Sequence, residues 1–171
     1  MINGTEVERV TQYDYLGSTI RSDLSWSVNT DNRVAKAKKN VHGLRRLRDF
    51  RVSKKLLRMF YSATIESVLF YGVSVWGPRL TQRDKRWIKQ VRKWACKIVG
   101  DSLPNLDTVY HSRGTKLARK IMCDTTHPLN KCFEMLPSGK RMRQPPATKE
   151  RSKKTFVPNI VAYMNRSGKP R

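Results

Sequence analysis

Apolar residues recur every three or four positions along three consecutive segments of the chain. This spacing aligns side chains on one face of an α-helix, whereas in a strand the residues of one face recur at every second position. The three stripes are Val34, Ala37, Val41, Leu44 and Leu47; Leu56, Leu57, Phe60, Tyr61, Thr64, Val68 and Leu69; and Trp87, Val91, Trp94 and Ile98. We therefore predict a mainly α fold in which a helical bundle begins at about Asn29.

Capping residues and glycines indicate where these helices begin and end. Ser53 is a plausible N-cap of the second helix, which runs toward Gly72. Thr81 can cap the third helix, which ends at Gly100. A weaker apolar pattern predicts a fourth helix over about 105–122.

A β-hairpin is predicted before the helices. The stretch TQYDYLGSTIRSDLSW, residues 11–26, indicates two short strands with Tyr13 and Tyr15 on one face and a turn at Leu16 and Gly17. Residues 2–9 alternate around an Asn-Gly turn signal, so we expect short β structure over 2–22. A lone hairpin is at best marginally stable in water, and this one therefore needs a surface on which to pack.

The end of the chain has a different composition. From Pro137 to Lys154 it is rich in Pro, Ser, Lys and Arg and carries almost no apolar residues, so it cannot bury enough surface to offset the entropy of ordering. The later stretch FVPNIVAYMN is apolar enough to fold back on the helices. We divide the chain into a hairpin (1–26), a helical body (29–134) and a basic, mostly disordered, flexible tail (135–171).

Charge is the strongest indication of a partner. The chain has 36 Lys and Arg against 13 Asp and Glu, a formal net charge of +23. Such a field attracts polyanions, so nucleic acid is the expected partner. A solvated basic face without a ligand is the alternative. An anionic membrane surface is less favoured, because no segment combines a strong apolar face with interfacial Trp and Lys.

Compartment signals are few. The three cysteines, Cys96, Cys123 and Cys132, are widely spaced and odd in number, which suits a reducing compartment better than a disulfide framework. The start of the chain has no apolar signal-peptide core, and no run approaches the length of a membrane span. We expect an intracellular protein, nuclear or cytoplasmic.

Motifs for catalysis are missing from the sequence. There is no phosphate-binding G-x-x-x-x-G-K-[ST] loop, no G-x-G-x-x-G and no H-E-x-x-H. The aspartates form neither an adjacent pair nor the Asp-x-Asp spacing that would hold two magnesium ions for phosphoryl transfer. Nothing in the sequence indicates an active site or a cofactor, and enzymatic activity of this chain alone is left open.

Two residue groups allow a functional and a packing interpretation. His111, Cys123, His127 and Cys132 have gaps that resemble zinc-ligand spacing, but the usual Cys-x-x-Cys knuckle is absent. We favour a packing role, with Cys123 as a small buried apolar residue at a helix end. Trp87 and Trp94, seven residues apart, would stack bases if exposed. An aromatic stripe at helical spacing is more often core, and we favour core.

The order of these segments resembles a known arrangement. YDYLGSTIRSDLSW resembles the hairpin that follows the catalytic palm in reverse transcriptases of LINE-type (non-LTR) retrotransposons, where a YLG-like turn forms the primer grip. AKAKKNVHGLRRLRDFRVSKKLLRMFYSATIESVLFYGVSVWG resembles the thumb that follows. RDKRWIKQVRKWACKIVG resembles its next helix, and HPLNKCFEMLPSGKRMR the post-thumb stretch. The resemblance covers about residues 2–143.

The resemblance implies a non-catalytic fragment that grips a template–primer duplex, an RNA–DNA hybrid or DNA, through basic helix faces. In such a reverse transcriptase the palm, with the two catalytic aspartates, and the fingers lie upstream of this segment. RNA-directed DNA polymerase activity would therefore require those parts. The nucleic-acid-binding residues that we predict are Tyr15, Leu16, Gly17, Lys36, Lys39, Arg45, Arg46, Arg86, Lys89, Lys93, Lys97, Arg141 and Arg143.

Segments of this kind also carry the name of the N-terminal domain of an AlkB homologue. The alternative is therefore an N-terminal-type module of an AlkB-like tRNA-modifying enzyme, a 2-oxoglutarate-dependent dioxygenase or a methyltransferase. Such an oxygenase holds iron with a His-x-Asp pair and a distant His, and no His in this chain is followed two residues later by Asp.

Overall fold

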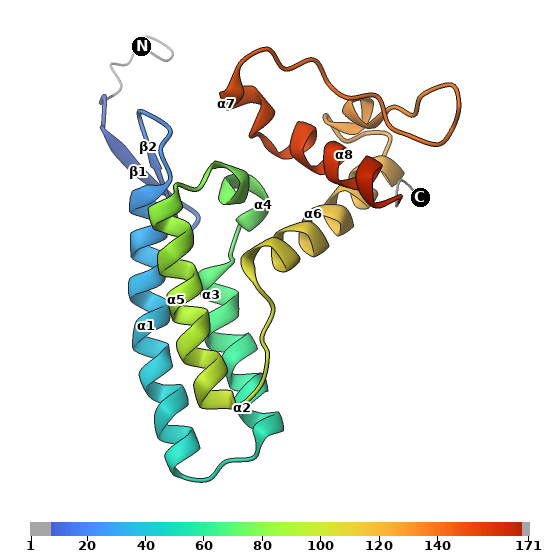
Figure 1. Cartoon of the computed structure of the whole chain (residues 1–171). Coiled ribbons are helices and arrows are strands. Elements are labelled where there is room, and N and C mark those ends of the chain that lie inside the picture. The colour runs from blue at the N-terminus through green and yellow to red at the C-terminus, as the bar shows by residue number, and fades with distance from the viewer. Residues whose placement is uncertain (1–7, 169–171) are drawn as a thin grey trace.

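The computed structural model of this chain describes residues 8–168. A small hairpin lies at one end of a bundle of long helices, and a second group of helices lies beside the bundle (Figure 1). The elements are strands β1 Gln12–Tyr15 and β2 Ser18–Arg21, helices α1 Ser27–Asp49, α2 Lys54–Phe60, the π-helical η1 Tyr61–Glu66, α3 Ser67–Leu69, α4 Val73–Trp76, the 3-10 helix η2 Gly77–Arg79, α5 Gln82–Val99, α6 Leu106–Cys123, the 3-10 helix η3 Asn130–Phe133, α7 Glu150–Lys153 and α8 Phe156–Ser167. The predicted mainly α fold with an N-terminal β-hairpin is confirmed.

The hairpin has the turn that the sequence predicted. β1 and β2 pair antiparallel, with Tyr15 opposite Ser18, so Leu16 and Gly17 form a two-residue loop. Both loop residues have positive φ, 46° for Leu16 and 74° for Gly17, as the right-handed twist of a two-residue hairpin requires. Glycine adopts this conformation freely, whereas a leucine there is strained. Of the expected earlier β structure, residues 2–7 lie outside the described residues, and 8–10 form no strand.

The second predicted helix, expected from Ser53 to Gly72, contains a π-helical stretch that its apolar pattern did not predict. α2, η1 and α3 follow one another directly, and η1 widens the helix in the middle. Side chains bind carbonyl groups there: Asn40 Nδ2 of α1 donates to the Thr64 carbonyl at 2.7 Å, and Thr64 Oγ1 donates to the Phe60 carbonyl at 2.8 Å. The wide turn therefore rests on a partner helix, and local sequence spacing carries no record of that contact.

The first hydrophobic core lies between α1, the α2–α3 helix, α4 and α5. Its largest fully buried side chains include Trp76, Tyr61 and Phe70. Trp76 Nε1 donates to the Tyr71 carbonyl at 2.9 Å, and Trp26 packs against the edge of the core. Both tryptophans therefore pack against apolar residues of the bundle.

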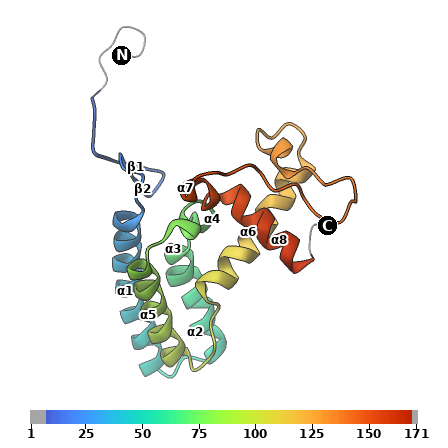
Figure 2. The ribbon, with the colours of Figure 1, turned by 45° about the horizontal axis from the view of Figure 1, so that its top comes forward.

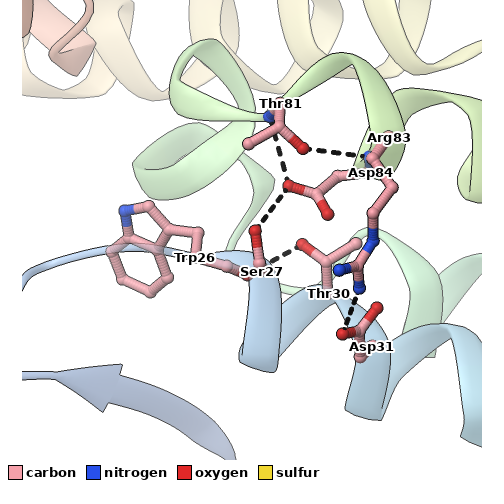
Figure 3. Close-up of polar contacts among 7 residues, drawn as sticks. All are labelled: Trp26, Ser27, Thr30, Asp31, Thr81, Arg83 and Asp84. Atoms are coloured by element: carbon pink, nitrogen blue, oxygen red, sulfur yellow. Dashed lines mark hydrogen bonds and ion pairs between the residues drawn. The ribbon is translucent and has the colours of Figure 1, made fainter.

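A capping box joins the start of α5 to the start of α1 (Figure 3). The Asp84 backbone N–H donates to Thr81 Oγ1 at 3.2 Å, and the Thr81 N–H donates to Asp84 Oδ2 at 3.1 Å. Ser27 Oγ of α1 donates to the same carboxylate oxygen at 3.1 Å, while Arg83 pairs with Asp31 on the surface. The predicted cap Thr81 is confirmed, and its partner Asp84 is almost fully buried.

A second, smaller core lies between the later part of α6, η3 and α8, and in both views α8 crosses α6 (Figure 2). Ile160 and Met164 of α8 are fully buried in it. Gly114 of α6 allows this approach, because a Cβ there would lie 2.8 Å from Ile160 Cδ1. The apolar stretch of the tail thus folds back as expected, whereas the predicted disorder from Pro137 to Lys154 stays a prediction.

We expect Asp84→Ala to lower the free energy of unfolding by about 1–3 kcal/mol, because it removes the reciprocal cap and leaves Ser27 without its partner. Asp107→Ala is the matched control: it removes the same group from the exposed first turn of α6. Urea unfolding followed by circular dichroism measures both. Equal stability of the two variants would contradict a structural role for the buried carboxylate.

Candidate nucleic-acid interface

A buried arginine joins the hairpin to the helices. Arg33 of α1 is 6% exposed. Its Nη2 donates to the Gly17 carbonyl at 3.0 Å and to Ser18 Oγ at 2.9 Å, both in the hairpin. Its Nη1 donates to the Val68 carbonyl of α3 at 3.2 Å, and its Nε to Asn29 Oδ1 at 3.2 Å. One side chain therefore fixes three elements relative to one another.

The electrostatic setting of Arg33 is unusual for a charged side chain. Burial lowers the pKa of its guanidinium below the ordinary value, because the charged form loses the water that would solvate it. The charge lies over the ring of Tyr71, 5.0 Å from the ring centroid, which offsets part of that loss. The oxygens that accept these hydrogen bonds from Arg33 are neutral carbonyl, amide and hydroxyl oxygens rather than carboxylates.

Strand β2 docks on α1 through a second polar cluster. The Thr19 N–H donates to Asn29 Oδ1 at 3.3 Å, and Asn32 Nδ2 donates to Thr19 Oγ1 at 3.1 Å. Thr19 Oγ1 in turn donates to Asp14 Oδ1 of β1 at 2.6 Å. The surface that the hairpin needs is thus supplied by the first turns of α1, within the chain itself.

The outer strand and the turn of the hairpin leave large side chains uncovered. Tyr13, Tyr15 and Leu16 are 62%, 56% and 72% exposed. Leu16 is also held at positive φ, so the backbone presents an apolar side chain to solvent in a strained conformation. Large exposed apolar groups at the end of a docked ribbon are typical of a contact surface.

The structure brings four of the predicted residues together around one pocket. This hairpin pocket, about 680 Å³ in volume, opens between the hairpin turn, α1 and α3. Its lining includes Leu16, Gly17, Lys36, Lys39 and Tyr71. Lys36 and Lys39 are exposed and lie one turn apart on the same flank of α1, so the pocket has a positive rim.

Other predicted residues lie on other surfaces. Arg86, Lys89, Lys93 and Lys97 are exposed and follow the side of α5 that faces away from its buried residues. Arg45 is nine residues from Lys36, which places it about half a turn around α1 from the pocket rim. Arg46 is exposed, and its guanidinium lies 5.6 Å from the centroid of the Phe50 ring.

The two remaining predicted residues lie with the second core. Arg141 and Arg143 are exposed on either side of buried Met142. Arg143 Nε lies 3.7 Å from Glu134 Oε2, an ion pair on the surface. Neither arginine lines the hairpin pocket.

The core assignment for Trp87 is wrong. Trp87 is 41% exposed, and Lys38 Nζ lies 4.4 Å from the centroid of one of its rings. Trp94 is half-buried against the first core, with Lys38 5.9 Å from its ring. The stripe lies at the edge of the α1–α5 contact. Trp94 packs against the core there, whereas Trp87 is largely exposed beside Lys38. A seven-residue spacing does not distinguish these two environments.

The packing interpretation of the histidine and cysteine group is correct only in part. His111 stacks on Tyr163, and the His127 ring accepts at Nδ1 from the Leu129 N–H at 3.1 Å. Cys123, however, is exposed rather than buried. Within residues 8–168, no three His, Cys, Asp or Glu side chains form a group that could hold a metal.

Sequence reasoning missed Arg33, Asn29, Asn32 and Tyr71. A signal was present: Asn29 and Arg33 lie one turn apart in the first turns of α1, beside the apolar stripe rather than opposite it. Buried arginine is rare, so residue type and helical spacing alone assign Arg33 to the charged surface of this helix.

Comparison with known proteins gives one partial match. The family model described as the N-terminal region of alkylated DNA repair protein alkB homolog 8 matches residues 26–67, which cover α1, α2 and η1. No curated protein and no solved structure matches the chain. The comparisons support the AlkB-homologue name for this segment and give no support to the LINE-type resemblance. In the described part of the chain, no helix is long and apolar enough to cross a membrane.

We expect Arg33→Gln to loosen the hairpin, because a glutamine side chain cannot reach the acceptors on the hairpin, α3 and Asn29 together. Amide hydrogen exchange over 12–21 should accelerate by about tenfold or more, while exchange in α5 stays within about twofold. Arg45→Gln makes the same chemical change at an exposed position of α1 and should leave the hairpin rates unchanged. Unchanged exchange in Arg33→Gln would show that the hairpin docks without this side chain.

Proposed function

We propose that this chain is a non-catalytic nucleic-acid-binding module that holds a duplex at the hairpin pocket and along its basic helix faces. The observation that carries the proposal is the hairpin pocket, where Lys36 and Lys39 lie beside the turn residues Leu16 and Gly17. The net charge of +23 supports a polyanionic ligand.

The two kinds of side chain at the pocket suit different parts of a duplex. Lys36 and Lys39 are exposed point charges that can neutralise backbone phosphates without a fixed geometry. Leu16 in the pocket lining, and Tyr15 just before it at the end of β1, offer exposed apolar surface for a sugar or for the face of a terminal base. Arg33 is buried and acts as a positioning residue, because its hydrogen bonds hold the turn against α1.

The exposed row on α5 offers a second line of phosphate contacts. From Arg86 to Lys97 the row spans about 16 Å of helix axis. That length matches roughly five base-pair steps of a duplex at 3.4 Å per step. Arg45, Arg46, Arg141 and Arg143 are further proposed contacts, and all four side chains are exposed.

Two candidates exist for the catalytic domain that such a module would serve. The match over residues 26–67 to the N-terminal region of an alkB homologue favours an AlkB-like enzyme. That such an enzyme would modify tRNA is part of the proposal and follows from the AlkB-homologue alternative. Under that hypothesis this chain supplies nucleic-acid binding, and the oxygenase or methyltransferase chemistry is assigned to a catalytic domain fused to it. The resemblance of residues 2–143 to a LINE-type primer grip and thumb favours a polymerase palm, with the duplex as template–primer.

We expect binding to be steeply salt-dependent and to depend on the pocket lysines. For an RNA–DNA hybrid, Lys36→Ala with Lys39→Ala should reduce the slope of log K against log salt by about 1.8, since each lost phosphate contact removes about 0.9. Fluorescence anisotropy across a salt series measures this slope. Lys140→Ala with Lys149→Ala is the matched control, because both lysines are exposed and outside the pocket.

Equal slopes for the pocket variant and the control would contradict the pocket as the duplex site. The same titration with a tRNA-like RNA hairpin separates the two candidate enzymes. Tighter binding of the RNA–DNA hybrid supports the hypothesis of a polymerase module. Tighter binding of the folded RNA supports the hypothesis of a tRNA-modifying enzyme. Affinity that stays flat between low and physiological salt would overturn nucleic-acid binding by charge.

A further inference from the structure

A second groove, of about 890 Å³, follows α6 where α8 lies beside it. This α6 groove shares no lining residue with the hairpin pocket. Its lining includes His111, Ser112, Thr115, Lys116, Lys120 and Tyr163. None of these residues belongs to the duplex surface proposed above.

One wall of the groove carries a pair of stacked rings. His111 of α6 and Tyr163 of α8 lie 3.7 Å apart between ring centroids, with their planes 3° from parallel. The ring of buried Tyr110 lies edge-on to the histidine ring, with 5.3 Å between the two ring centroids. His111 and Tyr163 are both half-buried, so each ring has one part held by protein and another part open to the groove.

The α6 side of the groove is positive and rich in donors. Lys116 and Lys120 are exposed and lie one helical turn apart, and Ser112 lies one turn before them. Asp107, near the start of the helix, is the single acidic residue in the lining. An anionic chain lying along α6 would therefore meet positive charge over two turns and aromatic rings beside it.

We propose that the α6 groove binds a single-stranded segment of nucleic acid, with Lys116 and Lys120 on consecutive phosphates and a base stacked against the Tyr163–His111 pair. Aromatic rings next to lysines in a groove are the arrangement by which proteins hold unpaired strands. A duplex does not suit this site, because its bases stack on one another and leave no face for the rings. The inference rests on residues separate from those of the proposed duplex surface.

The test uses the full chain and a fluorescein-labelled oligouridine 12-mer, with an oligothymidine 12-mer as the DNA arm. Lys116→Glu with Lys120→Glu should weaken single-strand binding by tenfold or more. Lys140→Glu with Lys149→Glu makes the same charge change at exposed positions outside the groove, and should cost less than threefold. Binding of the RNA–DNA hybrid should change by less than threefold in the groove variant, because that duplex contacts other helices.

Tyr163→Leu removes the ring and keeps an apolar side chain at the edge of the second core. It should weaken single-strand binding by about 5- to 100-fold, the effect of losing one stacked base, while Tyr163→Phe should bind as the parent does. Thermal unfolding checks that the core is intact, and if Tyr163→Leu unfolds, the lysine pair decides alone.

Two results would overturn the proposal. One is an equal loss of single-strand affinity in the groove variant and its charge-matched control, since the binding would then follow net charge alone. The other is an equal loss of hybrid and single-strand affinity in the groove variant, since both ligands would then share one surface. Loss confined to the single strands, with either RNA or DNA preferred, would support the groove and define its ligand.

Discussion

A guanidinium group placed inside a protein must find hydrogen-bond acceptors for its N–H groups, because it has lost the water that solvated its charge. Arg33 finds them in the Gly17 and Ser18 oxygens of the hairpin, the Val68 carbonyl and the Asn29 side chain. Leaving such a group unpaired costs several kcal/mol. The hairpin is therefore held in one orientation against α1. Because the turn forms one side of the hairpin pocket and α1 another, Arg33 also fixes the relative position of these two walls.

Much of the fold follows from hydrophobic spacing in the sequence. The stripes at 34–47, 56–69 and 87–98 predicted three helices, because burial of one helix face is the strongest constraint on such a chain. The capping of α5 by Thr81 also follows from local sequence. The π-helical turn does not, since it depends on Asn40 of another helix binding the Thr64 carbonyl. The cost of such a turn is offset by a tertiary contact, which spacing along one segment cannot indicate.

The predicted site residues show the same division between local and tertiary information. Exposed lysines such as Lys36 and Lys93 could be assigned to the surface from helical spacing alone. Their grouping could not, because it depends on which helix packs against which flank. Arg33 and Trp87 exchanged their expected environments: the charge is buried and the tryptophan is exposed. Residue type predicts average burial, and the edge of a helix–helix contact is where a single residue departs from that average.

Helix α6 belongs to both hydrophobic cores. Val109 and Tyr110, near its start, are buried in the first core, and Ala118 and Ile121, near its end, are buried in the second. A rigid helix shared in this way couples the unfolding of the two cores, so losing the α8 contact exposes apolar surface on α6 and weakens the support of the bundle. Helix α8 therefore covers an apolar face of α6 that would otherwise meet solvent, and exposed apolar faces of this kind promote aggregation.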